Sequence, residues 1–390
     1  MSYAVFDDPA VRDHLRPFTD TRPVGHLRTG ILTQHERWER YLDAPCSHLT
    51  QPYLAELFPF EGGADTCFVN GAVCATAELA DAVQNLSEGE ALRTPGGTLP
   101  AARTDRATFE AALVGNVEGL KEIPYQAAIT IVSRPWHLFK VNAAQIAADF
   151  DLLTAGRTSA PLDDPHTAVY APERVFLEPG ATVRAAVLNA EAGPIYLGKN
   201  AHVQEGSLLQ GPLTIGEGAV VNMGAKLRGG TTVGPYCKVG GEISSSVLIG
   251  YSNKGHDGFL GHSVLGEWCN LGADTNTSNL KNTYGPVRVW SHAEQRPVDT
   301  AETFCGLLAA DHVKAGINTM FNTGTVAGVG ANVFGAGFPP KHIAAFAWGG
   351  EGRYDPDKFM ETAARVMSRR KVVLTDAYAR MLRAVWEATA

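Results

Sequence analysis

Polar side chains that could do chemistry are densest between Tyr251 and Lys281. A neutral histidine is the standard base for deprotonating an amine or a hydroxyl before acyl transfer, because its pKa lies near the working pH. Lysine and asparagine side chains hold phosphates and hydroxyls. The alternative interpretation is a set of solvated corners and stacked asparagine ladders. The residues that crowd into this stretch are Lys254, His256, His262, Asn270, Asn276 and Asn279.

A strict repeat of six residues indicates the scaffold that must position this cluster. Helices repeat near 3.6 residues and strands at 2, whereas the short faces of a left-handed parallel β-helix repeat at 6, with the aliphatic residue pointing inward. This architecture mostly serves acyltransferases, whose sites lie between neighbouring coils of a homotrimer. The aliphatic residues of the repeat are Leu197, Val203, Leu209, Ile215, Val221, Leu227, Val233 and Val239.

The repeat divides the chain into four parts. Residues 1–155 predict an α/β domain, because short apolar strands alternate with helical patterns, and residues 156–174 predict a linker rich in Pro, Thr and Asp. Residues 175–350 are expected to form the β-helix, with a break in register at Ser245 and an outward loop over 280–303. Residues 351–390 predict C-terminal helices, the first capped by Asp355.

Composition excludes several classes of function. The 390-residue chain has a formal net charge of -8 and no Lys/Arg run, which argues against nucleic-acid binding. Six scattered cysteines without a CxxC spacing predict reduced, mostly buried thiols in a cytoplasmic protein. We expect no signal peptide and no membrane span, because no apolar run reaches the roughly 18 residues that a span needs.

The polar stretch resembles the acetyltransferase half of the bifunctional N-acetylglucosamine-1-phosphate uridylyltransferase/glucosamine-1-phosphate acetyltransferase family. That family has a KxGH segment, then NIGAGT, then an Asn-Tyr pair. Here Lys254-Gly-His256 is followed by Asn270-Leu-Gly-Ala and by Asn279. The resemblance implies that His256 is the general base, that Asn270 and Asn279 contact the sugar phosphate, and that Lys254 and Asn276 bind substrate beside them.

Two departures and one further segment refine this resemblance. Phe259 and Leu280 stand where the family has substrate-binding tyrosines, so an amino sugar phosphate is implied without its identity. Gly316 and Thr319 fall in a G-S-D-T-like segment near acetyl-CoA, with Ile317 in place of the serine. The implied co-substrate is therefore acetyl-CoA, and the implied ligands are sugar phosphates and sugar nucleotides.

The N-terminal domain is similar to sugar nucleotidyltransferases through Leu15-Arg16-Pro17-Phe18-Thr19-(x)2-Arg22-Pro23. The resemblance implies nucleotide binding by Arg16, Thr19, Arg22 and Asn70. The family's glycine-rich phosphate loop is replaced by Asp7-Asp8-Pro9, and Asn70-Gly71 is followed by Ala72 where a metal-binding Asp is usual. Asp7 and Asp8 remain candidates for Mg²⁺, against a turn-forming role.

Two other classes of function stay open. A metalloenzyme of the γ-carbonic anhydrase type uses the same β-helix and needs three histidines on Zn²⁺ between subunits. His256, His262 and His312 are available, but the gap between the first two differs from that family's HxxxxH. The other class is a non-catalytic regulatory protein whose N-terminal domain senses sugar nucleotides, which the lost glycines favour.

Overall fold

The computed structural model describes residues 1–350 and 352–389, and their contacts divide into two compact units. The first unit comprises Met1–Leu27 and Leu32–Arg134. The second comprises Arg28–Ile31 and the chain from Pro135 onward. The boundary falls before the end of the expected domain at 155, because helix α6 (Asn142–Thr154) packs on the coils of the second unit, where Asn142 Nδ2 donates to the Gly230 carbonyl at 2.8 Å.

The first unit is built on a mixed sheet of six strands in the order β2-β1-β3-β6-β5-β7. Strand β1 pairs in parallel with both β2 and β3, and β3 pairs antiparallel with β6. The strands are β1 (Ser2–Phe6), β2 (Cys46–Leu49), β3 (Thr66–Asn70), β5 (Glu90–Arg93), β6 (Ala101–Thr104) and β7 (Lys121–Pro124), beside a small pair of β4 (Val73–Cys74) and β8 (Thr130–Ile131).

Short helices with capped starts connect these strands. Thr33 begins α2 with a capping box to Glu36, and Thr76 caps the next helix through Leu79 N. The helical elements of the unit are α1 (Pro9–Arg12), η1 (Asp13–Leu15), η2 (Phe18–Asp20), η3 (Val24–His26), α2 (Gln34–Leu42), η4 (Pro52–Leu54), α3 (Ala77–Gln84) and α4 (Arg106–Leu113).

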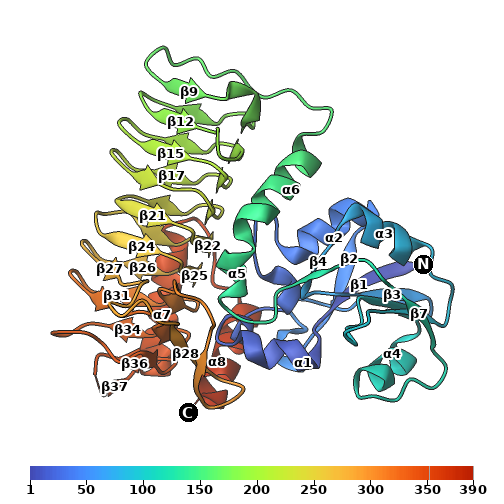
Figure 1. Ribbon diagram of the computed structural model, residues 1–390. Coiled ribbons are helices and arrows are strands. Elements are labelled where there is room, and N and C mark those ends of the chain that lie inside the picture. Colours follow the sequence, from blue (N-terminus) through green and yellow to red (C-terminus); the bar gives the residue numbers. More distant parts are fainter. Residues whose placement is uncertain (351, 390) are drawn as a thin grey trace. The chain divides into compact units, whose positions relative to one another are not determined.

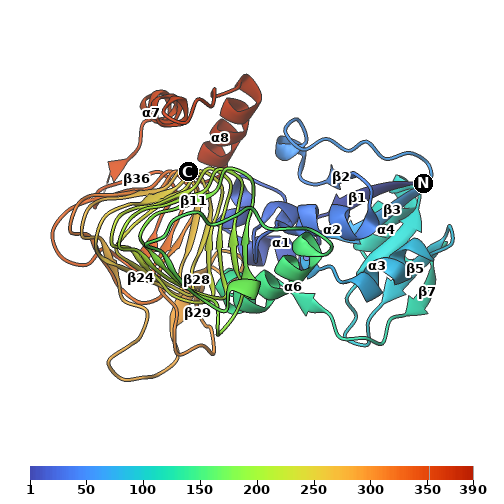
Figure 2. The same ribbon diagram turned by 90° about the horizontal axis from the view of Figure 1, so that it is seen from above.

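The second unit contains a left-handed parallel β-helix of stacked coils, drawn side-on in Figure 1 and from above in Figure 2. Successive coils pair in register, as Leu197 with Ile215 and Val203 with Val221. All eight aliphatic residues of the six-residue repeat are buried inside it, which confirms the interpretation of that repeat.

Three ladders of strands form the faces of the coils. The first is β10 (Val175–Leu177), β13 (Ile195–Leu197), β16 (Leu213–Ile215), β19 (Thr231–Val233), β22 (Val247–Gly250), β25 (Val264–Glu267), β30 (Leu308–Ala309), β33 (Val326–Ala327) and β35 (His342–Ile343). The second is β11 (Thr182–Val183), β14 (His202–Val203), β17 (Val220–Val221), β20 (Lys238–Val239), β23 (Asn253–Lys254), β26 (Asn270–Leu271), β31 (Lys314–Ala315), β34 (Asn332–Val333), β36 (Ala347–Trp348) and β37 (Gly352–Arg353). The third is β9 (Ala168–Tyr170), β12 (Val187–Asn189), β15 (Leu208–Gln210), β18 (Lys226–Leu227), β21 (Glu242–Ser244) and β24 (Phe259–Gly261), followed by the pair β27 (Asn276–Thr277) and β32 (Met320–Phe321).

The break in the repeat at Ser245 is a shortened coil. Thr214 pairs with Thr232, 18 residues on, whereas Thr232 pairs with Val247, only 15 residues on. The expected outward loop over 280–303 contains an antiparallel hairpin of β28 (Arg288–Ser291) and β29 (Arg296–Asp299).

The tail forms the expected helices α7 (Pro356–Ser368) and α8 (Asp376–Ala388), capped by Asp355 and Thr375. A short helix, α5 (His137–Lys140), precedes α6. All six cysteines are buried thiols. Among the described residues, none of the helices has the length and apolar character that crossing a membrane requires.

Candidate functional sites

In the first unit, a buried ion pair stands at the carboxyl end of β1. Asp7 Oδ2 lies 2.6 Å from Arg12 Nη1 and accepts a hydrogen bond from Thr50 Oγ1 at 2.6 Å, while Asp7 Oδ1 accepts one from Val24 N at 2.7 Å. Burial raises the pKa of Asp7, and Arg12 opposes that rise. Arg12 therefore holds the LRPFTxxRP segment, which is expected to bind a nucleotide, against the end of β1. Arg12 itself belongs to no motif in the sequence.

Asp8 and Asn70 meet at the same strand end. Asp8 caps α1 through a hydrogen bond from Ala10 N at 2.9 Å, and its other oxygen accepts from Asn70 Nδ2 at 3.1 Å. All four carboxylate oxygens of Asp7 and Asp8 thus accept hydrogen bonds. Asp8 thus takes the turn-forming role as the cap of α1, while its oxygens, each with one hydrogen-bond donor, keep lone pairs that a cation could use, so Mg²⁺ binding by Asp7 and Asp8 stays a prediction.

The three residues of the LRPFTxxRP segment differ in accessibility. Arg16 is half-buried and bridges to Asp20, with Nε and Oδ1 2.6 Å apart. Thr19 is buried, and its hydroxyl donates to the Arg12 carbonyl at 2.9 Å. Arg22 is buried, and its carbonyl accepts from Arg12 Nη1 at 3.3 Å. Arg16 is therefore the residue of this group with side-chain surface to offer a phosphate.

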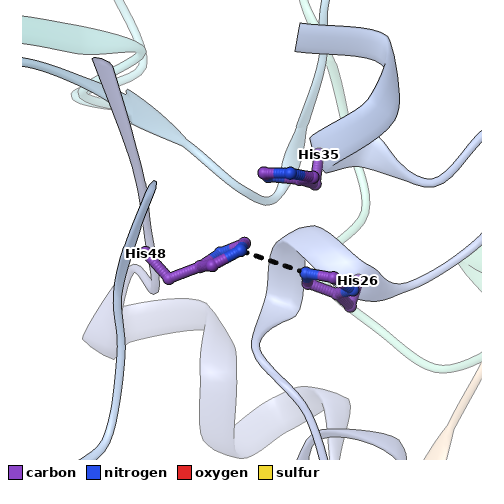
Figure 3. A group of neighbouring side chains, drawn as sticks. All are labelled: His26, His35 and His48. Atoms are coloured by element: carbon purple, nitrogen blue, oxygen red, sulfur yellow. Dashed lines mark hydrogen bonds between the residues drawn. The ribbon is translucent and has the colours of Figure 1, made fainter. Parts of the chain in front are cut away.

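The same unit contains a cluster of three histidines that was not predicted from the sequence. His26 ends η3, His35 lies in the first turn of α2, and His48 lies on β2, and Figure 3 shows the three rings gathered together. Their ligand-type nitrogens all lie within 4.8 Å of one another. Burial lowers the pKa of His48 to about 3 and also lowers the pKa of His35. The spacing of these residues along the chain gives no signal, because helix and strand packing brings them together.

In the second unit, Lys254 points into the coil. It pairs with Val239, a residue of the inward-facing column, and is 1% exposed. Its ammonium donates to the carbonyls of Gly240 at 3.1 Å, Asp257 at 3.1 Å and His256. Burial lowers its pKa to about 8. Because its ammonium donates to three backbone carbonyls, Lys254 holds the His256 loop from inside the coil, and its expected role in substrate binding stays a prediction.

His256 lies on an exposed corner between β23 and β24. The register of the second ladder puts it in one column with Met223 and Ile317, each two residues after an inward-facing position. Met223 and Ile317 are both 72% exposed. Each lies two coils, or about 10 Å, from His256. The corner therefore presents a histidine between two uncovered apolar side chains.

His262 occupies the other end of the β24 face. Its Nδ1 lies 2.9 Å from Asn279 Nδ2, and its ring packs on Phe304 and Phe139. Burial lowers the pKa of His262. An amide that donates to Nδ1 leaves the ring proton on Nε2. The polar stretch is thus divided between two corners, with His256 at one and the His262–Asn279 pair at the other.

The remaining expected ligand residues make local contacts. Asn270 is exposed and accepts a hydrogen bond from Asn253 at 3.3 Å, which is one step of an asparagine ladder. Asn276 is held by the backbone, accepting from Phe259 N at 2.8 Å and donating to Asp274 O at 2.9 Å.

The segment expected beside acetyl-CoA is a tight turn. Thr319 is buried and its hydroxyl donates to the Gly316 carbonyl at 2.8 Å. Gly316 stacks on Gly272 of the neighbouring coil, where an added Cβ would lie 2.7 Å from the Gly316 carbonyl carbon. These residues therefore shape the corner that also carries Ile317.

The three histidines considered for zinc in the β-helix do not gather within one chain. Within residues 1–350 and 352–389, the one group of three potential ligands that could hold a metal is His26, His35 and His48. His312 is buried and its Nε2 lies 3.1 Å from the Tyr378 hydroxyl.

Part of the chain is similar to known proteins. Residues 3–158 match the model of the family described as sugar nucleotidyl transferase. The bifunctional protein GlmU of Methanococcus aeolicus is 34% identical over 95 residues, covering 23% of this chain and 22% of that protein. The same protein of Methanocaldococcus jannaschii is 31% identical over 87 residues, covering 22% of this chain and 21% of its own. The chain spans about a fifth of the length of these relatives. Both resemblances seen in the sequence are confirmed.

Two solved structures with some likeness to the chain are acyltransferases by name. One is a UDP-N-acetylglucosamine acyltransferase of Arabidopsis, with 16% identity and a TM-score of 0.20, covering 53% of this chain and 76% of that one. Another is a mutant GDP-perosamine N-acetyl transferase of Caulobacter crescentus in complex with CoA and GDP-perosamine. It has 10% identity and a TM-score of 0.15, and covers 88% of this chain and 93% of that one.

Proposed function

We propose that this chain is a sugar-phosphate transferase whose β-helix carries an acyl group from acetyl-CoA to an amino sugar phosphate. The observation that supports this most is the exposed His256 on a corner held rigid from inside by Lys254. In the reaction, the amine nitrogen attacks the thioester carbonyl, a C–N bond forms and the C–S bond breaks. His256 takes the amine proton and returns it to the departing CoA thiolate.

We propose that the site is completed by a second copy of the chain in a homotrimer. Met223 and Ile317 flank His256 on the same corner and are largely exposed in the single chain. Burying such an aliphatic side chain stabilises an interface by about 1.5–3 kcal/mol. A partner that covers this column would remove both side chains from water and enclose His256.

The substrate contacts follow the accessible residues. Asn270 is exposed, so it retains the proposed role in binding the sugar phosphate, whereas Asn279 is half-buried with His262 at the other corner. Gly316 and Thr319 are proposed to shape the groove for acetyl-CoA at the same corner as Ile317.

For the first unit we propose binding of a sugar nucleotide with weak or no nucleotidyl transfer. The family match over residues 3–158 supports the ligand class. The replacement of the family's glycine-rich phosphate loop by Asp7-Asp8-Pro9 supports the low turnover, since this segment lacks the glycines that cradle nucleotide phosphates. Arg16 is the proposed phosphate contact. The six buried thiols suit a reducing cytoplasm.

The test is release of free CoA from acetyl-CoA with a panel of amino sugar phosphates and amino sugar nucleotides. We expect turnover on at least one acceptor. No release on any acceptor would remove the acyltransferase proposal and leave a sugar-nucleotide-binding protein. A parallel assay with UTP, dTTP and sugar 1-phosphates measures pyrophosphate, and rapid release would contradict the proposed low turnover of the first unit.

A further inference from the structure

The histidine cluster in the first unit has no part in the proposed acyl transfer. His26, His35 and His48 come from η3, α2 and β2, and the rings of His26 and His35 stack with centroids 5.1 Å apart (Figure 3). His48 is 8% exposed and its ring centroid lies 4.4 Å from that of His35. His26 and His48 share a hydrogen bond between their Nε2 atoms, drawn as a dashed line in Figure 3, and His35 lies beside this pair.

The spacing of the nitrogens fits a shared metal ion. His26 Nε2 and His48 Nε2 are 3.2 Å apart. Two ligands of a tetrahedral zinc with Zn–N of about 2.0–2.1 Å are separated by about 3.3 Å. The remaining nitrogen pairs lie within 4.8 Å, so small adjustments of the three side chains on binding would bring the set to coordinating distance.

A carboxylate behind the cluster strengthens this interpretation. Glu39 Oε1 lies 3.3 Å from His35 Nε2 and accepts a hydrogen bond from Cys46 N at 3.0 Å, which fixes it in place. Metal-bound histidines usually donate their second ring nitrogen to such a carboxylate. This contact leaves His35 Nδ1 as the ligand atom, and that atom is buried with no hydrogen-bond partner.

We propose that His26, His35 and His48 bind one Zn²⁺ ion. Three neutral imidazoles and no carboxylate in the first coordination sphere favour zinc over the oxygen-seeking Mg²⁺ and Ca²⁺. A set of three nitrogens leaves the fourth position for a water or an anionic ligand. The Phe58 ring, 4.6 Å from His26, forms an apolar wall beside the ion. This zinc site is separate from the β-helix and does not depend on the proposed acyl transfer.

The experiment uses the full chain, with any affinity tag removed and the metal stripped by a chelator. Equilibrium dialysis against Zn²⁺ followed by elemental analysis is expected to give one zinc per chain. Titration with Co²⁺ is expected to give the intense visible bands of a four-coordinate site, and Zn²⁺ is expected to bleach them. A stoichiometry near zero, or a weak octahedral cobalt spectrum, would overturn the proposal.

Variants locate the ion and keep the result clear of folding effects. We expect His26→Gln and His48→Gln to abolish stoichiometric binding. Glu39→Gln keeps an acceptor for Cys46 N, so the fold is retained, and we expect zinc affinity to fall by about 10–100-fold. The control is His166→Gln, which changes an exposed histidine of the second unit and should bind as the wild type does. Wild-type affinity in the three test variants would place the zinc elsewhere and refute the site.

Discussion

Replacing Lys254 by methionine tests whether this buried lysine supports the His256 loop or binds substrate. Methionine keeps the length and apolar stem of the side chain but removes the ammonium from the carbonyls of Gly240, His256 and Asp257. Leaving the buried Gly240 carbonyl and the part-buried His256 and Asp257 carbonyls without this donor costs about 3–9 kcal/mol, at about 1–3 kcal/mol for each. Burial holds the pKa of Lys254 near 8 rather than 10.5, so removing the charge returns about 3 kcal/mol. With the middle of the first range, we expect the free energy of unfolding to fall by about 3 kcal/mol in total.

The measurement is thermal unfolding together with steady-state release of CoA. For a unit of this size, about 3 kcal/mol corresponds to a fall in Tm of about 6–12 °C. Because the loop loses its support, kcat should fall with little change in KM for the sugar phosphate. The matched control is Lys238→Met, an exposed lysine one coil away, which should change neither. An unchanged Tm with a raised KM would refute this reasoning and restore Lys254 as a substrate-binding residue.

Three further outcomes follow from the structure. Between about pH 8 and 10.5 the folded Lys254 is neutral while the unfolded one is protonated, so the unfolded state binds more protons and the free energy of unfolding should rise with pH. The difference in denaturant midpoint between wild type and Lys254→Met should therefore grow across this window, and a constant difference would contradict the burial of Lys254. Ile317→Glu should convert the proposed trimer to monomers, as measured by light scattering. The control Val373→Glu changes a residue that is 77% exposed and lies outside the corner column, so it should leave the trimer intact. The same mass for both variants would remove the proposed subunit interface at this corner. Asp7→Asn leaves the buried Arg12 without its counter-ion and should lower the free energy of unfolding in urea by about 3–5 kcal/mol. The control Asp65→Asn, in a more exposed ion pair, should lower it by about 0–1 kcal/mol, and equal losses in the two variants would contradict the buried ion pair.

The sequence predicts the β-helix because its inward column needs one aliphatic residue in every six, and this demand is local. The position of Lys254 follows from the same rule after one correction. The coil containing Ser245 is shorter, so the inward phase moves to Leu248, Lys254 and Leu260. A lysine at an inward position, with leucines at the inward positions before and after it, predicts a buried lysine, but the polar residues around it make this pattern hard to recognise.

The features that sequence reasoning missed depend on long-range packing. His26, His35 and His48 meet because β2 pairs with β1 and because α2 and η3 pack on the same strand end, and no spacing along the chain encodes that. Arg12 likewise becomes the centre of the β1 end only when the LRPFTxxRP segment folds over it. The polar stretch predicted as one site is divided because a single strand, β24, separates its two histidines.

The most direct test of the central claim compares CoA release by the wild type, His256→Ala and His262→Ala on the best acceptor of the panel. The hydrogen bond from Asn279 places the proton of neutral His262 on Nε2, so this ring cannot act as the base, and His262→Ala should retain most of kcat. Loss of the base should lower kcat of His256→Ala by about 10²–10⁴-fold, with mass and Tm unchanged. Full activity in His256→Ala, or a larger loss in His262→Ala, would contradict the proposed mechanism.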